Sequence, residues 1–265
     1  MNSETSTSIR PGAQPFFLPG GPRGLLCIHG LGGTGDDFRA FADQLHGAGW
    51  TVSVMRVAGH GMTPADLGQT TMADWQASVD SAIEELAKSV QDIFLLGASF
   101  GGALAIDAAA RHPEVCGIVL VNTPLSYRVG GSFQLIGLKI LRLFSPTFPK
   151  PGLTAADKAR YEKSGSLVAW PISAILDSRK FMSHTVRPSL PNMKTPALLI
   201  RNGDDPYVST KNTDEIRRQY GGPVQEYVLT QKTHRPFRDP EQTAIIAAQV
   251  ERFAVDCLEK KNVIN

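Results

Sequence analysis

Residues 97–102 read Gly-Ala-Ser-Phe-Gly-Gly and directly follow the apolar run Ile-Phe-Leu-Leu at 93–96. Such a run predicts a buried strand, and the stretch 100–111 has the character of a helix. A strand, then Gly-x-Ser-x-Gly, then a helix describes a tight turn that holds Ser99 in a strained backbone conformation. Its hydroxyl is expected beside a helix N-terminus, where free N–H groups suit a developing oxyanion. We interpret Ser99 as a nucleophile; the alternative is a purely structural glycine-rich turn.

Short apolar runs alternate with longer amphipathic stretches along the chain, which is typical of strand–helix units in a mostly parallel sheet. The apolar runs 14–18 and 24–28 flank Pro-Gly-Gly-Pro, which predicts a leading hairpin. Further strands are expected at 51–57, 92–97, 116–121, 197–201 and 224–229. Helices are expected at 36–48, 73–88, 100–111, 210–220 and 240–259.

One region interrupts this alternation. Between Asn122 and Pro196 no clear strand is predicted, and about seventy residues are too many for a simple connection. The stretches 132–144 and 154–164 have helical character. We therefore predict a helical cap, or lid, at 125–190. It would be inserted into a core formed by 15–124 and 191–265, and a loosely ordered segment, 1–14, would precede that core.

A serine hydroxyl needs a base, usually a histidine that is itself held by a carboxylate. On this kind of sheet the acid and then the histidine should follow the serine, on loops after later strands. Asp205 comes directly after the expected strand 197–201, and His234 follows 224–229. We take Asp205 as the acid, with its neighbour Asp204 as the rival, and His234 as the base. His29 and His60, each beside a glycine, are expected to shape tight loops.

At these positions the chain resembles enzymes of the α/β-hydrolase fold, and among them the small carboxylesterases and bacterial monoacylglycerol lipases. The resemblance runs from about Pro15 to the end of the sequence. It rests on His-Gly-Leu-Gly-Gly at 29–33, Gly-His-Gly-Met-Thr-Pro at 59–64, the segment 97–102, Asp205 and His234. The resemblance implies an oxyanion hole formed by the backbone N–H groups of Leu31 and Phe100. The pattern departs from many relatives at Thr233 and at the cations Arg235 and Arg238.

The segment 132–144, Ser-Phe-Gln-Leu-Ile-Gly-Leu-Lys-Ile-Leu-Arg-Leu-Phe, has an apolar face wider than packing on one surface requires. We predict a lid helix that lines an acyl-chain pocket and makes transient contact with a lipid surface. The alternative is plain packing of the cap on the core. The side chains predicted to line the pocket are Leu135, Leu138, Trp170 and Phe181.

Composition excludes several other functions. The 27 basic and 25 acidic residues are mixed along a chain of 265 residues and leave a net charge of +2, so nucleic acid is not an expected partner. The histidines and three cysteines lack metal-site spacing, and no metal or cofactor is expected. No apolar stretch reaches the length of a transmembrane helix or forms the core of a signal peptide. Widely spaced, unpaired cysteines favour the reducing cytoplasm.

The sequence therefore predicts a serine hydrolase that cleaves carboxylic esters through an acyl-enzyme. Ser99 would attack the carbonyl, His234 would carry the proton and Asp205 would orient the imidazole. A thioesterase or a carbon–carbon bond hydrolase could use the same three residues. A non-catalytic ligand-binding module is the alternative outside enzymology, although its usual mark, a missing member of the triad, is not found here.

Overall fold

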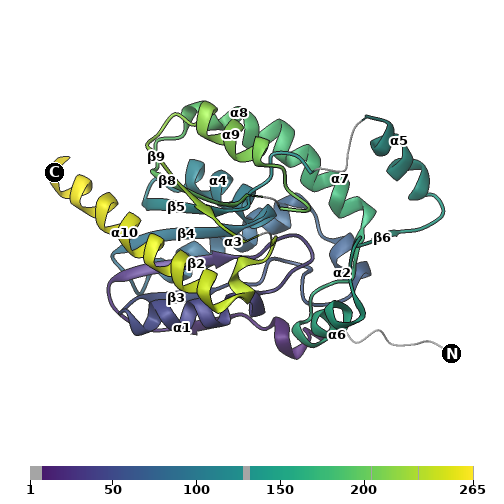
Figure 1. Cartoon of the computed structure of the whole chain (residues 1–265), viewed down its shortest axis with the longest axis horizontal. Helices are drawn as coiled ribbons and strands as arrows, with labels where there is room; N and C mark the ends of the chain where they lie inside the picture. The colour runs from purple at the N-terminus through teal and green to yellow at the C-terminus, as the bar shows by residue number, and fades with distance from the viewer. Residues whose placement is uncertain (1–7, 128–131, 204, 232, 265) are drawn as a thin grey trace.

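The computed structural model describes residues 8–127, 132–203, 205–231 and 233–264, with backbone alone at 132–136 and 262–264. Seven strands in these ranges form one sheet, in the order β1-β3-β2-β4-β5-β8-β9 (Figure 1). Neighbouring strands are parallel except β1 and β3, which run antiparallel. The strands are β1 (Phe16–Leu18), β2 (Arg23–Ile28), β3 (Thr51–Val54), β4 (Asp92–Ala98), β5 (Val115–Val121), β8 (Ala197–Asn202) and β9 (Val224–Leu229).

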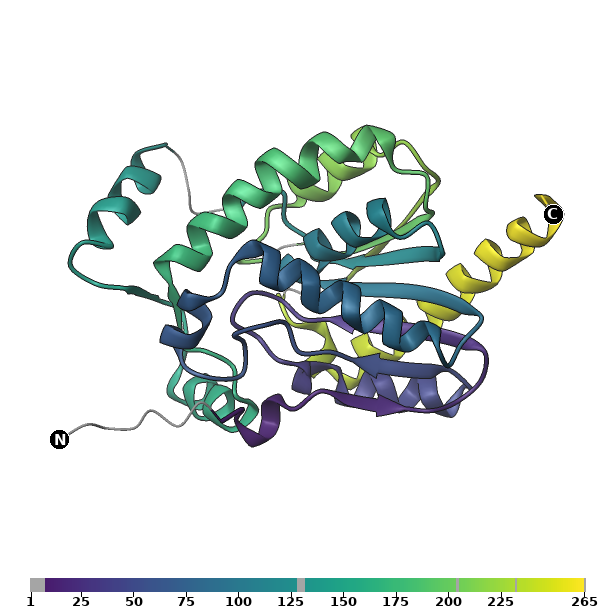
Figure 2. The same cartoon turned by 180° about the vertical axis from the view of Figure 1, so that it is seen from behind.

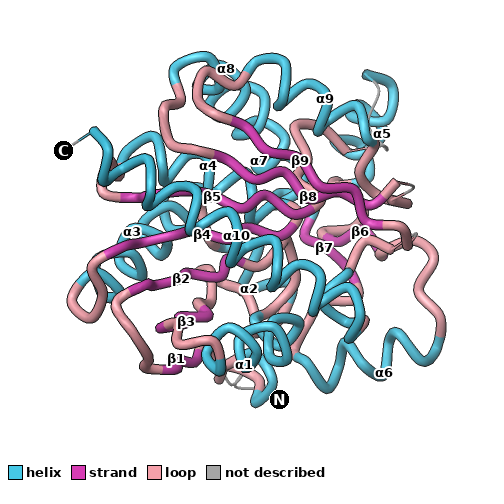
Figure 3. Tube along the Cα trace, turned by 60° about the vertical axis from the view of Figure 1, so that its left-hand side comes forward, coloured by secondary structure: helices cyan, strands magenta, loops and turns pink. Residues whose placement is uncertain are grey.

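Helices cover both faces of this sheet, as Figures 2 and 3 show from two further directions. The alternation of side chains along each strand explains the two layers. In β2, Leu25 and Cys27 pack with α1 (Arg39–Gly47) and α10 (Pro240–Ile264), whereas Leu26 and Ile28 face the other layer. That second layer contains α3 (Met72–Ala87), α4 (Phe100–Arg111) and α9 (Thr210–Gln219). The arrangement is that of an α/β-hydrolase, as the resemblance implied.

The segment between β5 and β8 contains helices and two short strands. The helices are α5 (Ser132–Leu141), α6 (Ala155–Ser164), α7 (Ile172–Phe181), the π-helical turn η3 (Met182–Val186), α8 (Arg187–Ser189) and the 3-10 turn η4 (Leu190–Asn192). The strands β6 (Thr147–Pro149) and β7 (Ala169–Pro171) pair antiparallel. This pair could not be expected from the sequence, because three residues are too few to show an alternating pattern. Figure 1 shows α5 standing apart from the layered body.

The later part of this segment packs on the body rather than over the pocket. Phe181, Met182, Val186 and Leu190 belong to the same buried cluster as α4. These four residues therefore join the end of the segment to the body.

One expected strand pairing differs from the structure. The prediction of a leading hairpin is wrong, because β1 pairs with β3 and not with β2. Both edges of β2 are occupied by β3 and β4. The Pro-Gly-Gly-Pro segment links β1 to β2, two strands that do not pair, and in it Gly21 N donates to Gly49 O. Among the described residues before β1, Pro11–Ala13 forms the 3-10 turn η1, and Ala13 is buried.

The remaining elements are η2 (Gly35–Phe38), α2 (Pro64–Gln69) and η5 (Pro236–Arg238). In the described ranges, no helix combines the length and the apolar character that crossing a bilayer requires.

Candidate active site

Ser99 occupies the turn between β4 and α4 that the glycine pattern predicted. Its backbone has φ 53° and ψ −127°, a conformation that L-residues rarely adopt. A Cβ atom added at Gly97 would meet the backbone of Gly101 and Gly102, and one added at Gly101 would meet Ile28 O. The turn is thus held by close backbone approach on both sides. The amide of Ser99 donates to Val121 O at 2.8 Å, which ties the turn to β5.

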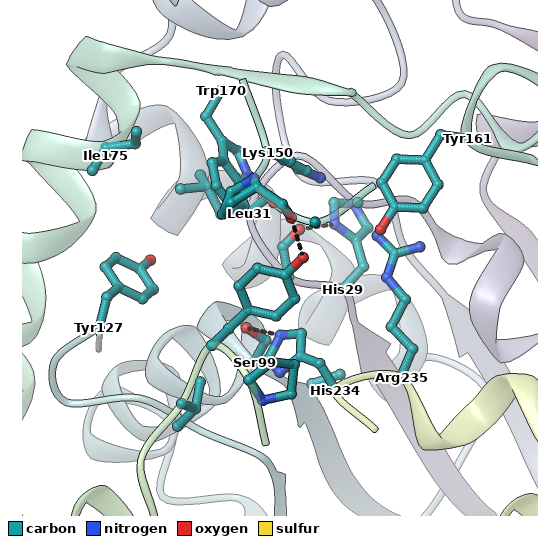
Figure 4. Close-up of a pocket in the computed structure, with 18 of the residues that line it drawn as sticks. His29, Leu31, Ser99, Tyr127, Lys150, Tyr161, Trp170, Ile175, His234 and Arg235 are labelled. Carbon is teal, nitrogen blue, oxygen red and sulfur yellow. Dashed lines mark hydrogen bonds between the residues drawn. The ribbon is translucent and has the colours of Figure 1, made fainter. Parts of the chain in front are cut away.

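Three side chains from three loops meet at this turn. Nε2 of His234 lies 3.1 Å from Oγ of Ser99, and Nδ1 of His234 lies 2.6 Å from Oδ2 of Asp205 (Figure 4). Asp205 is 2% exposed, and its Oδ1 accepts the backbone N–H groups of Tyr207 at 2.7 Å and Val208 at 2.9 Å. With Nδ1–H donating to Asp205, Nε2 is free to accept the proton of the Ser99 hydroxyl. The rival residue, Asp204, lies outside the described residues.

The loop after β2 lies against Ser99. A Cβ atom added at Gly30 would come within 3.0 Å of Ser99 Cβ, so glycine allows the loop this approach. Leu31 follows Gly30 and lines the pocket. Phe100 is the first residue of α4, where helical N–H groups have no partner in the helix. The Phe100 side chain is buried in the body, with rings packed edge-on to Trp75 and Phe181.

His29 and His60 have the structural surroundings that we expected. Nδ1 of His29 lies 3.1 Å from Gly30 O, and its Nε2 accepts the N–H of Val57 at 3.1 Å. Nδ1 of His60 lies 3.0 Å from Ala58 O. Burial lowers the pKa of His29 to about 4 and holds the pKa of His60 well below its usual value. Both rings are neutral near pH 7 and brace the loops after β2 and β3.

A cavity of about 670 Å³ opens at Ser99 and His234. Leu138 and Trp170 line it, as predicted from the sequence. Phe181 does not belong to the lining, because it packs on Phe100 inside the body. The side chain of Leu135, the fourth predicted pocket residue, is not among those that the structure describes. The lining also includes residues that sequence reasoning missed, chief among them Tyr127, Phe148, Lys150, Tyr161, Ile175 and Tyr207.

Of these missed residues, Tyr207 could have been predicted from the sequence, whereas Lys150 could not. Tyr207 stands two positions after Asp205 in the same loop, and its ring lies 5.1 Å from that of His234. Proximity to the predicted acid could have identified it. Lys150 is only 7% exposed, against the strong tendency of lysine to remain at the surface, and nothing in its sequence context signals this burial.

The cations after His234 are paired with a carboxylate. Nε of Arg238 lies 2.6 Å from Oδ1 of Asp37, and Nη1 of Arg235 lies 3.4 Å from its Oδ2. Within the described part of the chain, no group of three or more His, Cys, Asp or Glu side chains could hold a metal ion.

The sheet, the strained serine turn and the order of the three side chains define an α/β-hydrolase. A family model described as serine aminopeptidase, S33, matches residues 21–241, and the chain belongs to this family. The thermostable monoacylglycerol lipase of Bacillus sp. (strain H-257) is 31% identical over 247 residues, which cover 93% of this chain and 96% of that protein. A carboxylesterase of Bacillus subtilis (strain 168) is 30% identical over 113 residues, 42% of this chain and 46% of that protein.

Solved structures of lipolytic enzymes are also similar to this chain. A metagenome-derived lipolytic enzyme superposes with a TM-score of 0.82 at 28% identity, covering 94% of this chain and 100% of the other. The monoacylglycerol lipase of Paleococcus ferrophilus shares the fold, with a TM-score of 0.74 at 21% identity, over 92% of this chain and 98% of the other. The chain is a carboxylic ester hydrolase of the lipase and esterase type.

Proposed function

We propose that the enzyme cleaves esters of apolar acyl chains through an acyl-enzyme on Ser99, and that monoacylglycerols are a substrate class. The observation that carries this proposal is the continuous hydrogen-bonded line from Ser99 Oγ through His234 to Asp205. The similarity to monoacylglycerol lipases supports the choice of substrate.

In the first step, Ser99 Oγ attacks the ester carbonyl while its proton moves to Nε2 of His234. Asp205 holds the imidazole in the tautomer that leaves Nε2 unprotonated, and it stabilises the cation that forms. The backbone N–H groups of Leu31 and Phe100 donate hydrogen bonds to the developing oxyanion. The imidazolium then gives its proton to the leaving alcohol. Water, activated by the same histidine, finally hydrolyses the acyl-enzyme.

The cavity has an apolar side that suits an acyl chain. Leu138, Leu141, Phe148 and Ile175 line it, and the first two come from α5. We therefore assign α5 and the segment around it, within 125–190, as a cap over the acyl site. The far side of α5 and the turn after it carry exposed Ile140, Leu143 and Phe144, which support contact with a lipid surface.

We place the enzyme in the cytoplasm, since all three cysteines are unpaired.

A fluorophosphonate probe tests the nucleophile. The wild-type protein should be labelled at Ser99, and Ser99→Ala should remove both the label and the esterase activity. A folded wild-type protein that resists the probe would indicate a ligand-binding module instead. A comparison of monoacylglycerols with acyl-CoA thioesters of the same chain length tests the leaving group. Turnover of the thioester alone would overturn the ester assignment in favour of a thioesterase.

A further inference from the structure

The cavity has a second side that is rich in positive charge. Its lining there includes Asp37, Lys150, Tyr161 and Arg235. Figure 4 shows Tyr161 and Arg235 on one side of Ser99, with Tyr127 and Ile175 on the other. The two sides therefore differ in chemistry as well as in position: one is apolar, and the other presents ammonium and guanidinium groups around an aromatic ring.

Three cations surround the ring of Tyr161. Cζ of Arg235 lies 4.1 Å from the ring centroid, Nζ of Lys150 lies 5.0 Å away and Cζ of Arg238 lies 5.3 Å away. Asp37 is the carboxylate that pairs with both arginines. One carboxylate cannot balance three cations, so this end of the cavity has an excess of positive charge when Lys150 is protonated.

Lys150 and Arg235 retain unused hydrogen-bond donors. The ammonium of Lys150 donates to Gly32 O at 3.2 Å and has no ion pair among the residues that the structure describes. Nη1 of Arg235 is buried and makes no hydrogen bond in the described part of the chain, since its contact with Asp37 is an ion pair at 3.4 Å. A buried donor without an acceptor destabilises the folded protein, and a bound ligand that supplies the acceptor removes this cost.

The charge of Lys150 depends on whether an anion is bound beside it. Burial, reinforced by Arg235 and Arg238, lowers the pKa of the Lys150 ammonium well below its usual value, although Asp37 opposes the shift. The Lys150 charge also contributes to the low pKa of His60, which is lowered mainly by burial. A bound carboxylate or phosphate would stabilise the ammonium form and restore its charge.

The position of these groups determines which part of the substrate they would meet. His234 protonates the leaving alcohol in the proposed mechanism, and Arg235 follows it directly in the chain. The apolar side of the cavity is occupied by the acyl chain in that mechanism. The cationic side is therefore left for the alcohol.

We propose that Lys150 and Arg235 form an anion-binding subsite, and that the preferred substrates are acyl esters whose alcohol part carries a carboxylate or a phosphate. This inference rests on the proposed esterase function and narrows its substrate class. No new bond is formed at the subsite: the two cations bind and orient the alcohol while Ser99 and His234 act on the ester.

The test compares 4-butyryloxybenzoate with 4-butyryloxybenzamide, which differ in one charge on the leaving phenol. We expect kcat/KM to favour the benzoate at least tenfold in the wild-type enzyme, and the preference to disappear in Lys150→Met. Lys163→Met, at an exposed lysine of α6, is the matched control and should retain the preference. Arg235→Gln provides a second variant, should Lys150→Met fail to fold. A preference unchanged by both substitutions would overturn the inference, as would its absence in the wild type.

Two further comparisons identify the source of the charge. A 1-acylglycerol 3-phosphate set against the matching monoacylglycerol tests phosphate. A 4-nitrophenyl hemisuccinate set against 4-nitrophenyl butyrate places the carboxylate on the acyl side, where we expect no advantage. A preference only in this last pair would contradict the assignment to the alcohol.

A binding measurement separates this inference from the proposed function. Calorimetry should show 4-hydroxybenzoate binding to the Ser99→Ala protein at least tenfold more tightly than 4-hydroxybenzamide, with the difference lost on adding Lys150→Met. Equal binding of the two would refute the subsite even if the enzyme proves an active esterase. Anion-selective binding without any ester turnover would instead refute the esterase.

Discussion

The indole N–H of Trp170 donates a hydrogen bond of 2.9 Å to the carbonyl oxygen of Leu31. The bond joins β7, in the segment between β5 and β8, to the loop that approaches Ser99. Trp170 also packs beside Gly32, whose positive φ of 66° shapes that loop. The position of the proposed oxyanion donor at Leu31 therefore depends on a residue 139 positions away in the chain.

Replacing Trp170 with Phe removes this donor while retaining an aromatic ring. Because the Leu31 amide would be less firmly placed, we expect kcat to fall about tenfold with little change in KM. Steady-state kinetics with a short-chain ester measure both constants. A raised KM at unchanged kcat would show instead that Trp170 acts only by contacting the substrate.

Asp205→Asn should separate catalysis from folding. The replacement keeps an oxygen that can accept the Tyr207 and Val208 amides, so the loop should remain intact. The amide cannot hold the imidazole in the required tautomer, and the comparable change in a serine protease lowers kcat about 10⁴-fold. We expect a loss of about 10³–10⁴-fold in kcat with an unfolding temperature close to that of the wild type. Activity within tenfold of wild type would exclude Asp205 as the acid.

The candidate triad could be predicted from the sequence because each member lies in the connection that follows a strand. In a parallel sheet the carboxyl ends of strands lie at one edge, so residues as distant as Ser99 and His234 are brought together by topology alone. The glycines at 97 and 101 added a local signal that depends only on the backbone. Regular helices were equally predictable: the expected helix at 100–111 matches α4.

Other features depend on tertiary packing that no local pattern expresses. The Pro-Gly-Gly-Pro segment is a good turn signal, but the pairing of β1 was decided by which sheet edge remained open. Phe181 has the apolar character of a pocket residue, yet the packing of α7 turns it toward Phe100. The burial of Lys150 depends on Tyr161, Trp170 and Gly32, which meet it only in the folded chain.

Gly101→Ala tests the close packing around the serine turn. The new methyl group would overlap Ile28 O, a backbone atom that cannot move without shifting β2. We expect a destabilisation of about 3 kcal/mol, together with loss of activity. Gly47→Ala is the matched control, because a Cβ atom there meets nothing within 4 Å and alanine favours the helix. Thermal unfolding measures both variants, and equal stability of the two would contradict the steric argument.

Leu143 and Phe144 test the proposed lipid contact. Their exposures of 79% and 83% leave large apolar side chains in water just beyond α5. Changing both to Ser should weaken binding to phosphatidylcholine vesicles about tenfold or more, since each buried side chain of this size contributes about 1.5–3 kcal/mol. Hydrolysis of a water-soluble short-chain ester should not change. Val255→Ser, at an exposed site on α10, is the control for vesicle sedimentation, and unaltered binding by the double variant would exclude this surface.

His29 links stability to pH through its burial. Its pKa lies at about 4 in the folded protein, against an ordinary value of 6.5, so the unfolded chain binds an extra proton between these values. The contribution of the neutral, buried His29 to the free energy of unfolding is therefore fully present above about pH 6.5 and is lost as the pH falls toward 4. Protonation of Nε2 would also break the bond that it accepts from Val57 N.

Between pH 7.5 and 5, this single group should remove about 2 kcal/mol from the free energy of unfolding. The His29→Gln variant, which cannot take up that proton, should be less stable than wild type at pH 7.5 but should lose about 2 kcal/mol less on acidification. Urea denaturation at the two pH values measures the difference, with His46→Gln, at an exposed position of α1, as the control. An equal loss of stability in wild type and His29→Gln would show that His29 is not the group that titrates.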